Sequence, residues 1–176
     1  MKKIRLIILI FGFFACDDGD LQIETLDFDS VDPQTCETLT AEDANGYLIF
    51  KINGDEALIL ELPSTAFKNE VRNDTLNVAA TGSTKITYRI FDDTVSNEYF
   101  CSTVPLGSPI LIEEILAQQS ENSKIIISTT TEDNSAFSHA ISLSGISLET
   151  GAGQRITDLR INEFGTVTTQ APAETP

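Results

Sequence analysis

The chain has 176 residues and carries 27 acidic residues against 11 Lys and Arg, a formal net charge of −16 at pH 7. A protein this acidic repels polyanions, so nucleic acid and anionic lipid headgroups are excluded as ligands. A large negative charge is typical of an exposed domain, where it keeps the protein soluble. Calcium or a basic protein stays as the alternative, a cationic partner that the charge would attract.

Residues 1–15 have the layout of an export signal. Basic residues at positions 2–5 precede an apolar run at 6–14, and Ala15 is the small residue expected before a cleavage point. The run is shorter than the roughly 20 residues that a membrane-spanning helix needs, so removal is favoured over retention. An ordinary secretory signal would leave Cys16 as a free thiol.

The segment 13–16, Phe-Phe-Ala-Cys, resembles the lipobox of bacterial lipoproteins, with Phe13 in place of the usual Leu. This resemblance implies that Cys16 becomes the acylated first residue and anchors the protein to a membrane. Asp17, Asp18 and Asp20 follow at once and resemble the surface-export signal of Bacteroidetes lipoproteins. That second resemblance implies the outer face of the outer membrane.

The chain after the signal peptide suits one domain with a single core. We expect a lipidated acidic tether at 16–20, a folded domain at 21–167 and a flexible tail at 168–176, which is rich in Thr, Ala and Pro.

Short β-rich runs bounded by Gly, Asn, Asp or Ser recur along the domain. The clearest pair flanks Asn53-Gly54, which predicts a hairpin. The pattern predicts strands at 21–28, 47–52, 57–62, 75–79, 85–91, 110–115, 124–131, 139–148 and 156–161. It also predicts a turn at Arg-Asn-Asp, 72–74, and a bulge at Gly145. Residues 112–119 could instead form a helical turn. The fold expected is all-β, an antiparallel β-sandwich of about 8–9 strands, with an open barrel as the alternative.

If Cys16 is acylated, two cysteines remain in the chain, Cys36 and Cys101. In an exported protein such a pair indicates a disulfide rather than a metal or catalytic site. The pairing predicts that the two segments lie side by side.

His139 is the only histidine, so any Ser-His-Asp or Cys-His mechanism has to use it. No nucleophile motif accompanies it, and a partly buried structural histidine is favoured. Two carboxylates suffice for glycoside hydrolysis, and 27 acidic residues leave that alternative open without indicating a pair. The sequence indicates no cofactor.

Asp27, Asp29 and Asp32 cluster within a short stretch and are the calcium candidates, although they do not match an EF-hand loop and solvated turns are favoured. Three hydroxyl residues follow an Asp and precede an apolar residue, which looks like the O-glycosylation motif of exported Bacteroidetes proteins. They are Ser30, Thr75 and Thr94.

Most of the domain is similar to a family of small acidic flavobacterial lipoproteins. The resemblance lies in Asp-Phe-Asp at 27–29, Cys36, Leu-Ile-Phe-Lys at 48–51, Tyr-Arg-Ile-Phe at 88–91, Phe-Cys at 100–101, Thr-Thr-Glu-Asp at 130–133, Ile-Thr-Asp-Leu at 156–159 and Phe-Gly at 164–165. These motifs are structural and carry over no catalytic residue. We therefore expect a lipid-anchored surface module that engages a protein or glycan or supports envelope assembly, with a carboxylate-based glycoside hydrolase or a calcium-dependent binding module as the alternative.

Overall fold

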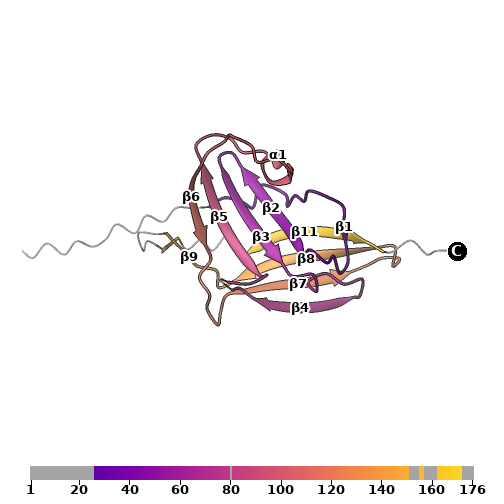
Figure 1. Cartoon of the computed structure of the whole chain (residues 1–176). Coiled ribbons are helices and arrows are strands. Elements are labelled where there is room, and N and C mark those ends of the chain that lie inside the picture. Colours follow the sequence, from indigo (N-terminus) through magenta and orange to yellow (C-terminus); the bar gives the residue numbers. More distant parts are fainter. Residues whose placement is uncertain (1–25, 80, 151–154, 157–161, 172–176) are drawn as a thin grey trace, which may run out of the picture.

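The computed structural model describes residues 26–79, 81–150, 155–156 and 162–171. Two β-sheets face each other, and in Figure 1 their strands cross at a steep angle. Sheet A has the order β2 (Tyr47–Asn53), β3 (Glu56–Leu62), β5 (Lys85–Phe91), β6 (Leu111–Leu116). Sheet B has the order β1 (Leu39–Thr40), β11 (Glu163–Gln170), β8 (Ala136–Ser144), β7 (Lys124–Thr130), β4 (Arg72–Asn77).

Every neighbouring pair in the two sheets is antiparallel except β1 and β11, which run parallel. A separate two-stranded ribbon joins β9 (Leu148–Glu149) to β10 (Arg155–Ile156). The predicted all-β sandwich is thereby confirmed. The predicted Asn-Gly hairpin is confirmed as well, since β2 pairs with β3 in register and Gly54 supplies the left-handed backbone (φ 65°) that the tight turn needs.

The main core lies between the sheets and is built from the inward side chains of both. Tyr47 and Ile49 point inward from β2, and Ile125 and Ile127 point inward from β7, as the two-residue period of a strand requires. The segment before β1 also contributes, because Leu26 and Phe28 are buried in the same cluster.

A second apolar cluster covers the outer face of sheet A. The short helix α1 (Asn97–Cys101) lies over this face, and its Phe100 stacks on Phe50 with 4.5 Å between ring centroids. Cys101 at the end of α1 is bonded to Cys36, with 5.2 Å between the Cα atoms. The predicted disulfide is confirmed, and it holds the helix to the segment that leads into β1.

Three local predictions are wrong. Residues 72–74 belong to strand β4 and not to a turn, because they pair with β7. Residues 168–170 belong to β11 and not to a tail, because they pair with β8. Gly145 ends β8 in a left-handed turn instead of forming a bulge, and an added Cβ there would lie 2.3 Å from the Asn122 carbonyl oxygen.

The remaining strand predictions fall partly outside the described residues. Of the predicted strand 21–28, only 26–28 are described, and they form no strand. Of the predicted strand 156–161, only the first residue is described, and it belongs to β10. The predicted strand 110–115 corresponds to β6, Leu111–Leu116, and the alternative helical turn does not form there.

Candidate binding pocket

A pocket of about 700 Å³ opens where one end of sheet A meets the start of β11. Three segments line it: residues 29–33, the inner face of β2 at Lys51, and residues 162–166. Volumes of this size are typical of small-molecule sites in proteins. The pocket therefore has room for a ligand larger than a single ion.

Lys51 lies on the inner wall of the pocket. It shares the inward face of β2 with Tyr47 and Ile49, and its side chain is 3% exposed. Its Nζ lies 5.8 Å from the centre of the Phe164 ring, a distance at which a cation and an aromatic face attract each other. Within the described part of the chain, Lys51 forms no side-chain hydrogen bond and no salt bridge. Its Nζ is not completely buried and reaches the space of the pocket.

The charge of Lys51 is subject to two opposing influences. Burial lowers the pKa of the ammonium because it removes water from the charged form, while the carboxylates of Asp29 and Asp32 act to raise it. Neither carboxylate is close enough to form a salt bridge with Lys51. The ammonium is thus held inside the pocket by the fold, with its donors directed to no carboxylate.

A bulge at the start of β11 shapes the opposite wall. The register with β8 shifts between Glu163 and Gly165, and the intervening Phe164 is buried beneath Lys51. Gly165 has a φ of 122°, a backbone conformation that glycine adopts readily and other residues rarely do. A Cβ added at this position would lie 2.8 Å from Cδ of Pro33. The bulge therefore turns Phe164 into the core and lets Pro33 pack directly on the β11 backbone.

Three carboxylates surround the mouth of the pocket. Asp29, Asp32 and Glu163 all line it, and all three residues are exposed. Among the described residues, the pocket is consequently polarised, with one positive charge on its inner wall and three negative charges at its solvent edge. Such an arrangement favours a ligand that presents a negative group inward and a positive group outward.

Two of the three calcium candidates are brought to this pocket. Asp29 and Asp32 line it, whereas Asp27 does not. Within the described residues, no group of three or more His, Cys, Asp or Glu side chains is arranged to hold a metal ion. The nearby ammonium of Lys51 would also repel a cation placed between these carboxylates.

His139 is buried on β8, away from this pocket, and 0% exposed. Its Nδ1 lies 2.9 Å from the Thr129 hydroxyl and its Nε2 lies 2.8 Å from the Thr169 hydroxyl. Thr169 donates its proton to the Asn69 side-chain oxygen, so its oxygen accepts from Nε2–H and Thr129 donates to Nδ1. Both ring nitrogens are satisfied, which is the arrangement of a structural histidine.

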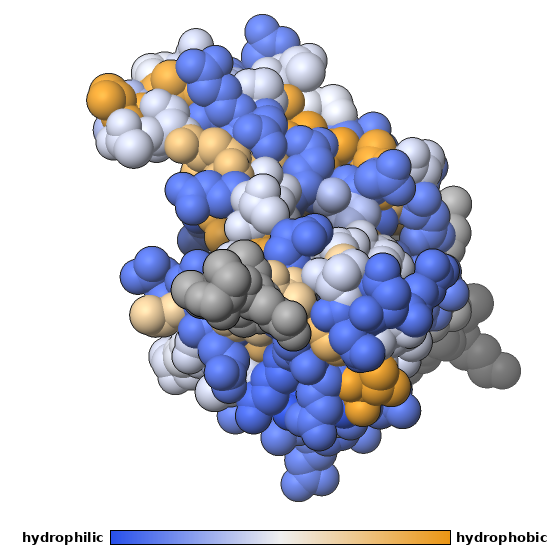
Figure 2. Space-filling view, turned by 90° about the vertical axis from the view of Figure 1, so that its right-hand side faces the viewer, coloured by the Kyte–Doolittle hydropathy of each residue, from blue (hydrophilic) through white to orange (hydrophobic). Residues whose placement is uncertain are grey.

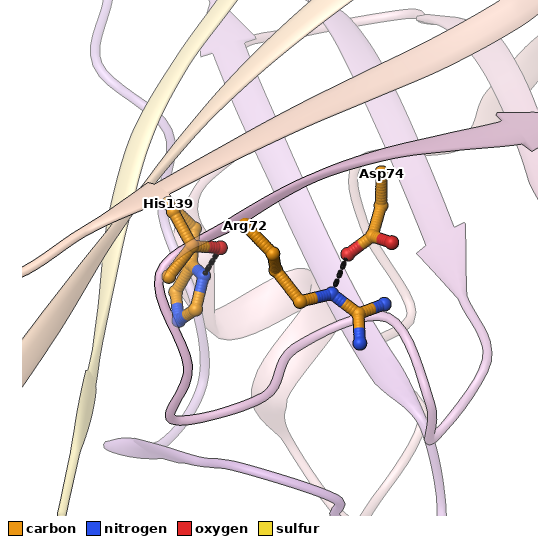
Figure 3. Close-up of polar contacts among 4 residues, drawn as sticks. Arg72, Asp74 and His139 are labelled. Carbon is orange, nitrogen blue, oxygen red and sulfur yellow. Dashed lines mark hydrogen bonds and ion pairs between the residues drawn. The ribbon is translucent and has the colours of Figure 1, made fainter.

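The described groups that contact His139 carry no charge that would activate it. Phe67 stacks on the imidazole at 4.5 Å between ring centroids, and burial lowers the pKa of His139 to about 4. Figure 3 shows the hydrogen-bonded imidazole beside the separate ion pair of Arg72 with Asp74 on β4. That ion pair is part-exposed and belongs to the surface of sheet B.

Ser30, Thr75 and Thr94 are all exposed, so each hydroxyl is sterically open to modification. Cys16, Asp17, Asp18 and Asp20 lie outside the described residues. Hydrophilic residues cover most of the face seen in Figure 2, and apolar residues occupy scattered spots, several of them along its upper part.

One signal in the sequence could have pointed to the pocket, and it lies in the alternation of side chains along β2. Lys51 is the single charged residue on the inward face of β2. A lysine is almost never fully buried without a reason, so its place in an apolar alternation marks it as exceptional.

No family model, no curated protein and no solved structure matches the chain. Within the described residues, no helix is long and apolar enough to cross a bilayer.

Proposed function

We propose that this protein is a lipid-anchored, non-enzymatic binding module of the cell surface that captures a small polar ligand in the Lys51 pocket. The observation that carries the proposal is Lys51, whose side chain is almost wholly buried while its ammonium faces the pocket and has no hydrogen-bond or salt-bridge partner in the described part of the chain. Burial of the lysine costs free energy because it removes part of the water around the charge, and charged groups perturbed in this way cluster at functional sites. The acylated Cys16 supplies the anchor.

Binding is favoured over glycoside hydrolysis at the same pocket. A hydrolase needs one carboxylic acid held in an apolar environment so that it stays protonated. Asp29, Asp32 and Glu163 all lie exposed at the mouth, and the buried titratable group is a lysine instead. The carboxylates are therefore placed to attract and orient a ligand rather than to cleave it.

The proposal has two parts, and each has its own test. Mass spectrometry of protein purified from membranes should find acyl chains on Cys16, and protease added to intact cells should release the wild-type domain. The matched variant Cys16→Ala should be neither acylated nor retained on the cells. Wild-type protein that is unmodified at Cys16, or shielded from protease in intact cells, would contradict the anchor.

The binding part is tested by titrating the purified chain with glycan fragments, amino acids and short peptides in a calorimeter. We expect at least one ligand whose binding is lost in Lys51→Met and kept in Lys124→Met. Lys124 is a suitable control because its ammonium is exposed and bonded to Asn77, away from the Lys51 pocket. If the chain instead hydrolysed a glycan that it did not retain, the binding proposal would be wrong.

A further inference from the structure

We infer that the Lys51 pocket takes a small zwitterion: a free amino acid or short peptide whose carboxylate contacts Lys51 and whose ammonium contacts the acidic mouth. This inference rests on the proposed binding function and adds the chemical class of the ligand. It is carried by the polarity of the pocket, in which the positive group lies inside and the negative groups lie outside.

The inner half of the site is the ammonium of Lys51. An ammonium has three donors, and among the described residues no oxygen accepts a hydrogen bond from this one. The Phe164 ring at 5.8 Å stabilises the charge from one side and leaves the donors unused. A ligand carboxylate would accept charge-assisted hydrogen bonds from Lys51, which are among the strongest that proteins form.

The outer half of the site is the pair Asp29 and Asp32. Both act electrostatically on Lys51, yet neither forms a salt bridge with it. The space that separates them from the ammonium is part of the pocket, since all three residues line it. A ligand that spans this space places its ammonium beside the carboxylates and its carboxylate beside Lys51.

Ligands with a single charge fit less well. A simple anion must pass Asp29, Asp32 and Glu163 and the field of a chain whose net charge is −16. A simple cation is attracted to the mouth but is repelled by Lys51. A zwitterion has no net charge to be repelled, and its two ends match the two ends of the pocket.

Pro33 and Gly165 keep these two halves apart. The proline rests directly on the β11 backbone, where an added Cβ would lie 2.8 Å from its Cδ. This contact holds the segment that bears Asp29 and Asp32 against sheet B. The next residue, Gln34, pairs with Phe50 of β2, the strand that bears Lys51. The distance between the positive and negative groups is therefore set by this pairing on β2 and by the contact of Pro33 with β11.

The test titrates the full chain with the standard L-amino acids and with alanyl-alanine, by calorimetry and by thermal melting. The best binder is then compared with two derivatives that each lose one charge: the N-acetyl form lacks the ammonium, and the amide lacks the carboxylate. We expect each derivative to bind about tenfold or more weakly than the parent, because each loses one charged hydrogen-bonding group.

Variants assign the two charges to their residues. Lys51→Met should weaken binding of the zwitterion about tenfold or more and should leave the amide unaffected, whereas Lys124→Met should change neither. The double variant Asp29→Asn, Asp32→Asn should weaken the zwitterion and should leave the N-acetyl form unchanged or better bound. In this pattern each variant weakens only the ligands that carry the matching charge. A general disturbance of the fold would weaken all ligands alike and would not produce it.

Two outcomes would overturn the inference, and they differ in what they say of the proposed function. If no amino acid or dipeptide binds at millimolar concentration, but a glycan fragment binds and is lost in Lys51→Met, the ligand class is wrong and the binding module stands. If neither class binds, both the ligand class and the proposed function fall. Binding that tolerates Lys51→Met would also overturn the inference, because the ligand would then lie elsewhere.

Discussion

Acidification should weaken the folded state through His139, the single histidine of the chain. Burial holds the pKa of the folded imidazole at about 4, whereas the ordinary value of 6.5 applies in the unfolded chain. Between these two values the unfolded chain takes up a proton that the folded protein does not. Stability is therefore full above pH 6.5 and falls as the pH drops towards 4.

The magnitude follows from the difference between the two pKa values. Each pKa unit corresponds to 1.36 kcal/mol, so the folded state should lose about 3 kcal/mol between pH 7 and pH 4 through this residue alone. The groups that contact the imidazole are Phe67 and the hydroxyls of Thr129 and Thr169, none of which gains or loses a proton in this range. The loss is accordingly a property of the buried ring.

The assay is urea unfolding at several pH values between 7 and 4, followed by far-ultraviolet circular dichroism because the chain has no tryptophan. Many carboxylates also titrate in this range, so the wild type is compared with His139→Asn, which keeps a polar group near Thr129. The difference in unfolding free energy between the two proteins should change by about 3 kcal/mol across the range. A difference that stays constant, or an imidazole that titrates near pH 6.5 by nuclear magnetic resonance, would refute the reasoning.

Three further substitutions test other parts of the structure. Replacing Cys36 and Cys101 by Ala should lower the unfolding free energy by about 4 kcal/mol, because a long covalent loop no longer restricts the unfolded chain; an unchanged urea midpoint would contradict this. Lys51→Met should raise the melting temperature, since it removes a buried charge and keeps the length of the side chain; a clear drop would argue that Lys51 is structural. Gly165→Ala should cost about 1–3 kcal/mol, and adding Pro33→Ala should recover only the part due to the clash, as urea titration of both variants would show.

The elements that the sequence predicted well are those in which local pattern and final structure agree. The hairpin of β2 and β3 combines apolar β-rich runs with a Gly54 turn, and all of this information lies within a few residues. The disulfide followed from counting the cysteines and from the expectation, based on the apparent signal segment, that the chain is exported. Neither prediction needed knowledge of distant contacts.

The elements that the sequence missed depend on distant partners. Strand β11 ends in Thr and Gln, which resemble a polar tail, yet Thr169 is buried because it bonds to His139 on the neighbouring strand. The first half of β4, residues 72–74, has the composition of a turn and forms a strand because it pairs along β7 at the edge of sheet B. In both cases tertiary pairing outweighs local propensity.

The pocket was hidden for a similar reason. Its three lining segments are far apart in the sequence, and each has an ordinary local explanation as an acidic turn, a strand or a strand start. The pairing of Gln34 with Phe50 brings the acidic turn to Lys51, and the packing of sheet B on sheet A brings Glu163 to the same opening. The inward parity of Lys51 was visible in the sequence, but its neighbours were not.

The disulfide at Cys36 also determines which part of the domain would resist a force that pulls on the N-terminal segment. If Cys16 anchors the chain in a membrane, as we propose, a pull on the domain enters through its N-terminal segment. Leu26 and Phe28 resist first because they are buried in the core, and the disulfide stops any further peeling before β1 and β2. The segment 29–33 lies between these two points of resistance. Asn53 of β2 donates a hydrogen bond to the Asp27 carbonyl and Gln34 pairs with Phe50, so both ends of this segment are also held by β2. A pull on the proposed tether would therefore load the mouth of the pocket before it reached either sheet.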